Sequence, residues 1–397
     1  MVSKRCYGLG TARSVIRELF EYGNQRAREV GPDGVFDFSI GNPSVAPPKA
    51  VLDELERLIR EEDPLQLHGY TSAQGDRAVR EKLAASLAKR FGHGYGPDDL
   101  YLTVGAAAAL CCVFHGLTEE PGDEFIVFAP YFPEYKVFIE GAGAKAVILP
   151  PHVPDFQIDL GAVEAAITPR TKGVLINSPN NPAGVVYTPE TLQGLGELLA
   201  RKSEELGRPI FLISDEPYRE IVYDGGTTPW APDFYDDTIV CYSYSKSLSL
   251  PGERLGYVLV GPQVAGGREV YAAVAGAGRT LGYVNAPSLF QRVCAACDGL
   301  TADLSIYAEN RRLLTEGLGA LGYDTSLPPA GTFYYFLPTL EEDDVAFCEK
   351  AKGLDLLLVP GSGFGAPGYT RLSFCVPTKR IEGALEVFGR LAKEYGR

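Results

Sequence analysis

Ser243-Tyr-Ser-Lys-Ser-Leu-Ser-Leu-Pro-Gly-Glu-Arg-Leu-Gly256 is the stretch of this 397-residue sequence that says most about its fold. It ends a predicted strand that begins at Thr238, so Lys246 is placed at the carboxyl end of that strand. In open α/β sheets, ligands bind at that edge. Serines flank the lysine and Arg254 follows it, which suits an aldehyde ligand that carries a phosphate. The amine can form a Schiff base, while hydroxyls and a guanidinium take the phosphate.

Outward from this stretch, helical periods and short apolar segments alternate from about Lys49 to Gly261. The predicted strands read LYLTV, EFIVFAP, KAVILP, KGVLINS, PIFLISDE, TIVCYSYS and LGYVLVG. This alternation predicts an α/β fold with a mainly parallel seven-stranded sheet flanked by helices. After about Val264, long helical stretches and a few strand-like pieces predict a smaller α+β unit. Near the amino terminus we expect an amphipathic helix with Thr11 as its N-cap.

The composition excludes several classes of function. Lys and Arg total 37 against 51 Asp and Glu, a net charge of −14, which disfavours binding to nucleic acid or to an anionic membrane surface. The apolar stretches are shorter than the roughly 20 residues that a membrane helix needs, and the start of the chain lacks the apolar segment of a signal peptide. Most cysteines lie in apolar segments, which is typical of reduced thiols, so we expect a cytoplasmic protein. We interpret the Cys294–Cys297 CxxC as an ordinary helix face and predict no metal site.

The stretch around Lys246 resembles the lysine signature of the class I aminotransferases, the aspartate-aminotransferase-like branch of the fold-type-I pyridoxal-phosphate enzymes. The resemblance extends from about Phe38 to Pro377. It implies that Lys246 carries pyridoxal 5'-phosphate, and that Ser243, Ser245 and Arg254 lie at its phosphate. It also implies a large cofactor-binding domain over residues 45–285 and a small domain built from both chain ends, residues 1–44 and 286–397.

Two further motifs match family residues that contact the cofactor ring. In Ser214-Asp-Glu-Pro-Tyr-Arg219, Asp215 matches the aspartate that pairs with the pyridine nitrogen, and a protonated nitrogen makes the ring an electron sink. Tyr218 matches the tyrosine that hydrogen-bonds the phenolic oxygen. The turn Asn177-Ser-Pro-Asn-Asn-Pro-Ala-Gly184 is similar to the family's NPxG turn. The resemblance therefore implies that Asn181 donates to the same oxygen and also lies at the substrate.

Small and aromatic residues complete the expected cofactor site. Thr103-Val-Gly-Ala-Ala-Ala-Ala-Leu110 runs from a strand into a helix, and small residues there let free N–H groups approach a phosphate. The matching family positions are Ala106 and Ala107, which act through their backbones. Phe132, in Ala129-Pro-Tyr-Phe-Pro-Glu-Tyr135, matches the aromatic residue that stacks on the cofactor.

Three matches concern the substrate and a second subunit. Gly41, in Ile-Gly-Asn-Pro-Ser, matches the glycine whose backbone meets the substrate carboxylate, and Arg371 matches the arginine that clamps this carboxylate with two hydrogen bonds. Tyr70, in Gly69-Tyr-Thr-Ser-Ala-Gln-Gly75, resembles the tyrosine that reaches the phosphate of the neighbouring subunit. The resemblance therefore implies a homodimer with shared active sites.

The resemblance implies ping-pong transfer of an amino group between an amino acid and a 2-oxo acid, with Lys246 as the general base. A carbon–sulfur β-lyase or an amino-acid oxidase on the same scaffold would keep Lys246, Asp215 and Arg371, so both alternatives stay open. A non-catalytic regulator with an aminotransferase-like domain is disfavoured by the acidity of the chain.

The nature of the substrate side chain is the least determined feature. Some aspartate-specific relatives place a lysine in the phosphate-loop segment to hold the distal carboxylate, and the aligned residue here is Ala107. We therefore expect no strict dicarboxylate specificity, although aspartate remains a possible substrate. Phe132, Tyr335 and Tyr7 are predicted to supply apolar surface for aromatic or medium-sized neutral side chains.

Overall fold

A seven-stranded sheet forms the centre of the protein in the computed structural model, which describes residues 2–12 and 15–397. Its strand order is β2-β8-β7-β6-β5-β3-β4, and β8 runs antiparallel to both of its neighbours while the remaining pairs are parallel. The mainly parallel sheet is thus confirmed, and every segment predicted as one of its strands forms one. The strands are β2 (Leu100–Thr103), β3 (Glu124–Phe128), β4 (Lys145–Leu149), β5 (Thr171–Asn177), β6 (Phe211–Asp215), β7 (Thr238–Ser243) and β8 (Gly256–Val260).

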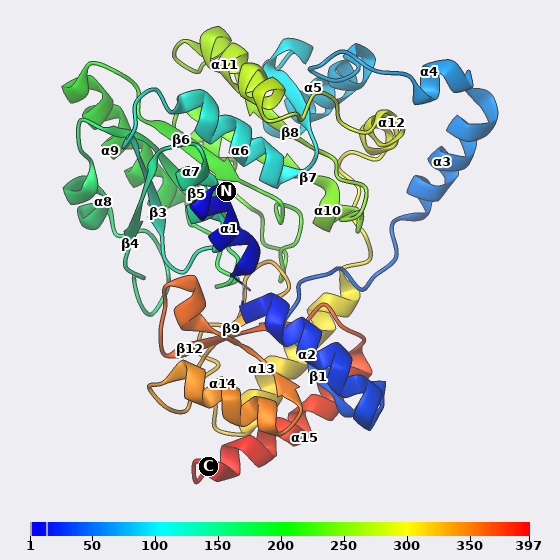
Figure 1. Ribbon diagram of the computed structural model, residues 1–397, viewed down its shortest axis with the longest axis vertical. Helices are drawn as coiled ribbons and strands as arrows, with labels where there is room; N and C mark the ends of the chain where they lie inside the picture. The colour runs from blue at the N-terminus through cyan, green and yellow to red at the C-terminus, as the bar shows by residue number, and fades with distance from the viewer. Residues whose placement is uncertain (1, 13–14) are drawn as a thin grey trace.

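Helices cover both faces of this sheet (Figure 1). One face packs on α6 (Ala106–Leu117), α7 (Glu134–Gly141) and α11 (Gly267–Thr280). The opposite face packs on α8 (Leu160–Ala166), α9 (Pro189–Leu206), α5 (Arg77–Phe91) and α12 (Ser288–Ala296). The central strands β6 and β7 are buried along their whole length, which explains why they read as continuous apolar runs in the sequence.

A second, three-stranded antiparallel sheet has the order β11-β12-β9. Its strands are β9 (Tyr334–Pro338), β11 (Val359–Pro360) and β12 (Tyr369–Ser373), and it is accompanied by α13 (Ser305–Ala320), α14 (Asp344–Gly353) and α15 (Thr378–Glu394). One apolar core joins β9 and β12 to these three helices, and the elements lie together below the large sheet in Figure 1. The predicted α+β character of this part is confirmed.

The two ends of the chain meet beside this small sheet. Strand β1 (Phe36–Asp37) pairs in parallel with β10 (Leu356–Leu357), and Arg26 on α2 (Val15–Val30) forms an ion pair with Asp355. The division into residues 45–285 and two chain ends stays a prediction. Helix α12, just after residue 285, packs on helices α3, α4 and α5 beside the large sheet.

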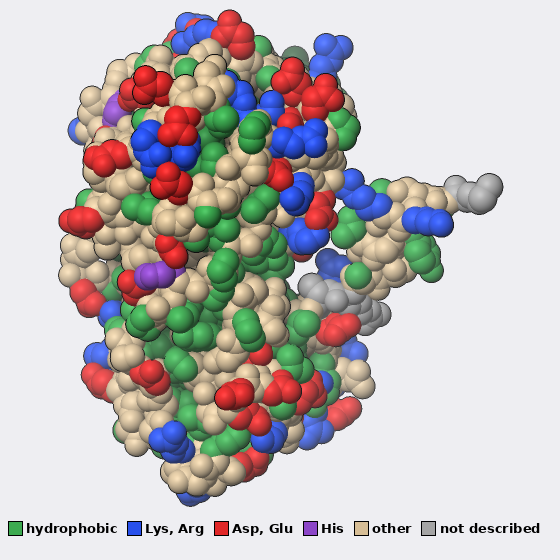
Figure 2. Space-filling view, turned by 90° about the vertical axis from the view of Figure 1, so that its left-hand side faces the viewer, with side chains coloured by type: hydrophobic (Ala, Val, Ile, Leu, Met, Phe, Trp, Pro, Cys, Tyr) green, Lys and Arg blue, Asp and Glu red, His purple; other side chains and the backbone are tan. Residues whose placement is uncertain are grey.

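The first helix of the chain differs from the prediction. Helix α1 (Lys4–Thr11) is capped by Ser3, whose side chain accepts a hydrogen bond from the backbone N–H of Cys6. Thr11 lies in the last turn of α1 and donates back to the carbonyl of Tyr7, so its prediction as the N-cap of the following helix is wrong. Helix α1 buries none of its residues and stands away from the body of the molecule in Figure 2.

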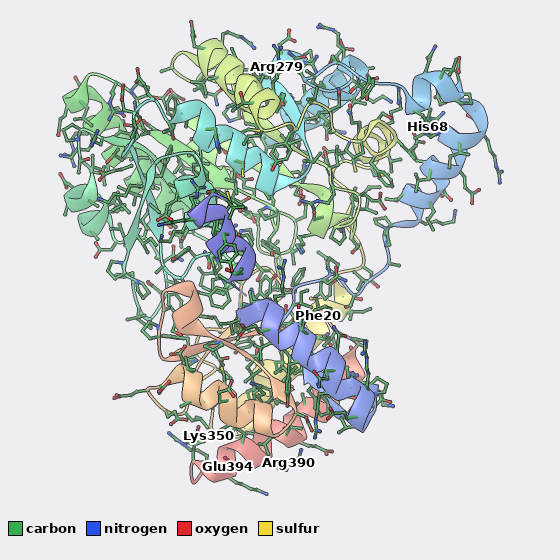
Figure 3. All side chains as sticks on the ribbon, in the orientation of Figure 1. Phe20, His68, Arg279, Lys350, Arg390 and Glu394 are labelled. Atoms are coloured by element: carbon green, nitrogen blue, oxygen red, sulfur yellow. The ribbon has the colours of Figure 1, made fainter. Side chains whose placement is uncertain are left out.

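The remaining helices are short or peripheral. Helices α3 (Lys49–Glu61) and α4 (Pro64–His68) extend from the body, and Figure 3 labels His68 at the end of α4 that faces the body. Helix α10 (Tyr244–Ser247) directly follows β7. The described residues also form 3₁₀ turns at Pro32–Gly34, Pro97–Asp99, Ala231–Asp233 and Gly361–Phe364. Among the described residues, no helix is both long and apolar enough to cross a membrane.

Candidate active site

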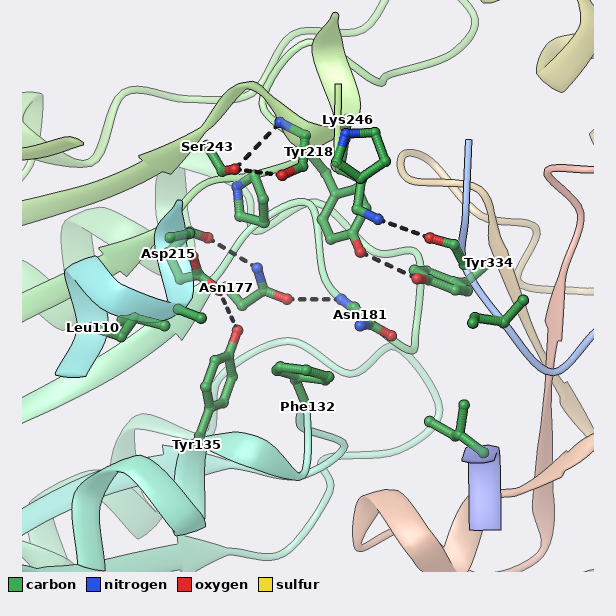
Figure 4. A pocket seen from close by; sticks show the side chains of 18 of the residues that line it. Leu110, Phe132, Tyr135, Asn177, Asn181, Asp215, Tyr218, Ser243, Lys246 and Tyr334 are labelled. Carbon is green, nitrogen blue, oxygen red and sulfur yellow. Dashed lines mark hydrogen bonds between the residues drawn. The ribbon is translucent and has the colours of Figure 1, made fainter. Parts of the chain in front are cut away.

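A cavity of about 300 Å³ lies at the carboxyl ends of β5, β6 and β7, where the large sheet faces the small one (Figure 4). The register of the sheet brings Asn177 beside Asp215 and Asp215 beside Cys241 at these strand ends. Every predicted cofactor and carboxylate residue lines the cavity except Tyr70, whereas Tyr335 and Tyr7, predicted for the substrate side chain, do not line it. These lining residues are Gly41, Ala106, Ala107, Phe132, Asn181, Asp215, Tyr218, Ser243, Ser245, Lys246, Arg254 and Arg371.

Lys246 lies in the single turn of helix α10. Ser243 caps this turn, because its side chain accepts from the backbone N–H of Ser245 at 3.2 Å. The Nζ of Lys246 donates a hydrogen bond of 2.7 Å to the carbonyl of Gly41. Burial lowers the pKa of Lys246 to about 8. A large fraction of this amine is therefore neutral near pH 8, and the neutral form is the one that can attack an aldehyde.

Asp215 ends β6 with both carboxylate oxygens buried. Its Oδ2 accepts a hydrogen bond of 2.5 Å from Tyr135, whereas its Oδ1 has no partner in the described part of the chain. Burial raises the pKa of Asp215 to about 7. A buried oxygen without a partner is costly in a protein interior, so a ligand that brings a donor there would be stabilised. A protonated ring nitrogen is such a donor.

A cradle for an anion is formed where β2 enters helix α6. Gly105 precedes the helix with a φ of 90°, and a Cβ at this position would lie 2.6 Å from Arg254 Nη2, so the backbone requires glycine. Arg254 Nη1 donates to the Pro251 carbonyl at 3.0 Å, and the hydroxyls of Ser243 and Ser245 are 2.7 Å apart. The amino end of α6, two hydroxyls and a guanidinium together suit a phosphate.

Arg371 enters the cavity from β12 of the small sheet. Its Nη1 donates to Asn181 Oδ1 at 3.1 Å and its Nη2 donates to the Ser39 carbonyl at 2.6 Å, while its buried Nε has no partner among the described residues. The rings of Tyr334 and Phe364 lie 4.5 and 4.8 Å from the guanidinium carbon. A buried, ring-flanked guanidinium with a free donor is suited to bind a carboxylate.

Two tyrosines at the site were missed in the sequence. Tyr135 is the donor to Asp215, and the Tyr334 hydroxyl lies 3.2 Å from that of Tyr218. Tyr135 lies in the same segment as Phe132, three residues further along the chain, and this proximity to a predicted cofactor residue was the available signal. The sequence did not show which face of β9 is directed toward the cavity, so it could not decide between Tyr334 and Tyr335 as the lining residue.

The predicted side-chain surface is partly wrong. Tyr335 is fully buried in the core of the small sheet, because successive residues of a strand point to opposite faces. Tyr7 lies on the exposed helix α1 and does not line the cavity of its own chain. Phe132 does line it, and the other apolar lining residues include Ile16, Ile40, Leu110 and Phe138.

Tyr70 lies outside the cavity. It precedes helix α5, and 98% of its surface is exposed. Its contribution to a neighbouring subunit stays a prediction.

Comparisons with known proteins agree with this geometry. The family model of the class I and II aminotransferases matches residues 33–388. An aspartate aminotransferase of Thermotoga maritima is 32% identical over 362 residues, covering 89% of this chain and 90% of the relative. An aspartate/prephenate aminotransferase of Thermus thermophilus is 30% identical and covers 93% and 94%.

Solved structures are similar along the whole chain. An amino transferase from Eubacterium rectale superposes with a TM-score of 0.98 at 53% identity, with 100% of both chains covered. The Thermus thermophilus aspartate aminotransferase with maleate superposes with a TM-score of 0.85 at 27% identity, covering 98% of this chain and 99% of that one.

Proposed function

The chain belongs to the class I and II aminotransferases, and from this premise we propose that it moves an amino group between an amino acid and a 2-oxo acid with pyridoxal phosphate bound at Lys246. The family uses this cofactor. One observation carries the proposal: a single cavity joins a buried lysine amine, an unpaired oxygen of Asp215 and the anion cradle at Arg254. These groups match the aldehyde, the ring nitrogen and the phosphate of the cofactor.

The residues around the ring then have separate tasks. When bound, the cofactor supplies an electron sink for the pair left behind when the substrate loses its α-proton. Asp215 would hold a proton at the ring nitrogen through its unpaired Oδ1. Asn181 and Tyr218, which line the same cavity, would donate from their amide and hydroxyl to the phenolic oxygen. Phe132 would stack on the ring and keep water from it.

Lys246 moves the proton. As a neutral amine its Nζ takes the proton from the substrate's α-carbon, and its pKa of about 8 leaves it close to the value that a general base needs at neutral pH. Arg371 orients the substrate by binding its α-carboxylate with the donors that now reach Asn181 and Ser39. Both half-reactions of the ping-pong cycle need Lys246 as the base and Arg371 as the carboxylate anchor.

We further propose that the substrate side chain is uncharged. In the described part of the chain, the cationic residues that line the cavity are Lys246, Arg254 and Arg371, and each already has a task. Ile16, Ile40 and Phe138 add apolar surface. The test is kcat/KM for aspartate, tyrosine, phenylalanine, leucine and alanine with one common acceptor. Aspartate exceeding every neutral substrate a thousandfold would refute this proposal.

The proposed homodimer is supported by an exposed apolar surface. Leu52 and Ile59 on α3 and Leu65 on α4 are exposed, close in sequence to the exposed Tyr70. We propose that Tyr70 serves the phosphate of the partner's site. Mixing a Tyr70→Phe protein with a Lys246→Ala protein yields hybrids in which one site keeps both residues. That site should bind pyridoxal phosphate more tightly than Tyr70→Phe alone, and equal affinity after subunit exchange would contradict the shared site.

The reaction itself is tested by incubating the holoenzyme with an amino acid and 2-oxoglutarate. Transamination yields glutamate in step with loss of the amino acid. A β-lyase acting on cysteine would instead release pyruvate and ammonia without 2-oxoglutarate, and an oxidase would consume oxygen. Either of these outcomes without glutamate would overturn the proposed function.

A further inference from the structure

The hydroxyl of Tyr135 forms a hydrogen bond with the buried carboxylate of Asp215. It donates 2.5 Å to Asp215 Oδ2, and the dashed line in Figure 4 shows it approaching Asp215 from helix α7, across the cavity from β7. Tyr135 is buried, and the described residues offer this hydroxyl no other acceptor. Burial keeps the pKa of Tyr135 well above its usual value, so the phenol stays a donor. Phe132 packs edge-on against its ring at 5.6 Å.

Within residues 2–12 and 15–397, no other side chain donates a hydrogen bond to the Asp215 carboxylate. The neighbouring Glu216 carboxylate accepts from Ser214 and from Arg219, and its negative charge opposes ionisation of Asp215. Tyr218 donates toward Tyr334 or accepts from it, and Cys241, paired with Asp215 in the sheet, is a neutral thiol whose pKa is raised by burial. The bond from Tyr135 is the one interaction that lowers the pKa of Asp215.

We propose that Tyr135 is a positioning residue that fixes the Asp215 carboxylate with Oδ1 free for the cofactor and keeps the shared proton on the cofactor's ring nitrogen. This inference rests on the proposed function. Its geometric basis is the asymmetry of the carboxylate, in which one oxygen is held by Tyr135 and the other is buried and unpaired at the cavity. Asn177 donates a hydrogen bond of 2.9 Å to the backbone carbonyl of Asp215 and so fixes the main chain. The position of the Asp215 side chain depends on the hydrogen bond from Tyr135.

The proton balance gives the direction of the effect. The proton shared by Asp215 Oδ1 and the ring nitrogen can be bonded either to the oxygen or to the nitrogen. The two forms differ only in the position of this proton. A hydrogen bond to Oδ2 stabilises the carboxylate and therefore favours the proton on nitrogen. Removing the hydroxyl makes Asp215 more basic, so the proton shifts to Oδ1 and the ring becomes a neutral pyridine. A neutral ring is a poorer electron sink.

The test compares Tyr135→Phe holoenzyme with wild type, each loaded with pyridoxal phosphate labelled with ¹⁵N in the ring. We expect the ring-nitrogen shift of the variant to move from the pyridinium toward the pyridine position, and kcat to fall about tenfold or more with little change in KM. Tyr235→Phe is the matched control. It removes another buried tyrosine hydroxyl, which donates 2.9 Å to the Ile210 carbonyl away from the cavity. It should keep the wild-type shift and kcat.

A wild-type ¹⁵N shift in Tyr135→Phe would overturn the inference. A wild-type protein that neither binds the cofactor nor transaminates would instead overturn the proposed function, so the two failures are distinguishable. If Tyr135→Phe does not fold, 3-fluorotyrosine at position 135 keeps the ring and strengthens the donor. The apoprotein with carboxyl-labelled Asp215 should then titrate at lower pH than wild type, and an equal or higher midpoint would contradict the role of Tyr135.

Discussion

Arg371 Nη1 donates a hydrogen bond of 3.1 Å to Asn181 Oδ1 and thereby joins the small sheet to the loop that follows β5 of the large one. The same guanidinium reaches the Ser39 carbonyl, so three distant segments meet at one cation. A carboxylate that binds Arg371 has to share or displace these partners. Substrate binding and the packing of the two sheets are therefore coupled at this residue.

Replacing Arg371 by lysine should raise KM across all substrates while changing kcat less. Lysine offers a point charge where the planar guanidinium offers two parallel donors, and losing one charge-assisted hydrogen bond costs about 1.5–3 kcal/mol, or roughly ten- to hundredfold in affinity. Steady-state kinetics with several amino acids measure this. Arg390→Lys on α15 is the control and should leave KM unchanged, because Arg390 does not line the cavity and lies at the bottom of the molecule in Figure 3. An unchanged KM in Arg371→Lys would exclude this arginine as the carboxylate anchor.

Gly41→Ala should reduce both stability and activity. A Cβ at this position would overlap the hydroxyl of Tyr334, and the backbone carbonyl of Gly41 would lose its place opposite Lys246. Overpacking of this kind costs about 1–3 kcal/mol. Urea denaturation checks it, with Gly94→Ala as the control because a Cβ there meets nothing within 4 Å. Adding Tyr334→Phe should recover part of the loss, and the absence of any loss in Gly41→Ala would contradict the close approach.

The buried lysine should make the stability of the apoprotein depend on pH in a defined window. Burial lowers the pKa of Lys246 from 10.5 to about 8, so between these values the unfolded chain binds more protons than the folded one. Stability from this group is lost as the pH falls through 8 and is fully present above 10.5. Relative to Lys246→Met, wild type should gain about 3 kcal/mol from pH 7 to pH 10.5.

Denaturant titrations of both apoproteins across this range test the prediction. Lys393→Met on α15 replaces an exposed lysine and should run parallel to wild type at every pH. A constant difference between wild type and Lys246→Met would show that the Lys246 amine titrates in the folded state as it does in the unfolded chain.

The sequence predicts the large sheet and most of the cavity because the informative residues stand at strand ends. Lys246, Asp215 and Asn181 follow apolar runs that could only be buried strands, and parallel strands bring their carboxyl ends to one edge. Tyr335 was wrongly assigned to the cavity in place of Tyr334, because a shift of one residue along β9 moves a side chain to the other face of the sheet. Tyr135 was missed because its partner lies 80 residues away, a contact that no local pattern encodes.

Borohydride reduction of the holoenzyme followed by peptide mapping tests the central claim most directly. Reduction makes the bond between the cofactor and its lysine permanent, so the modified residue can be read by mass spectrometry. The account predicts the phosphopyridoxyl group on Lys246, in the tryptic peptide that runs from Glu220 to Arg254 because the modified lysine is not cleaved. It also predicts that Lys246→Ala carries no label and does not transaminate. Stoichiometric label on another lysine, or turnover at the wild-type rate in Lys246→Ala, would contradict the assignment.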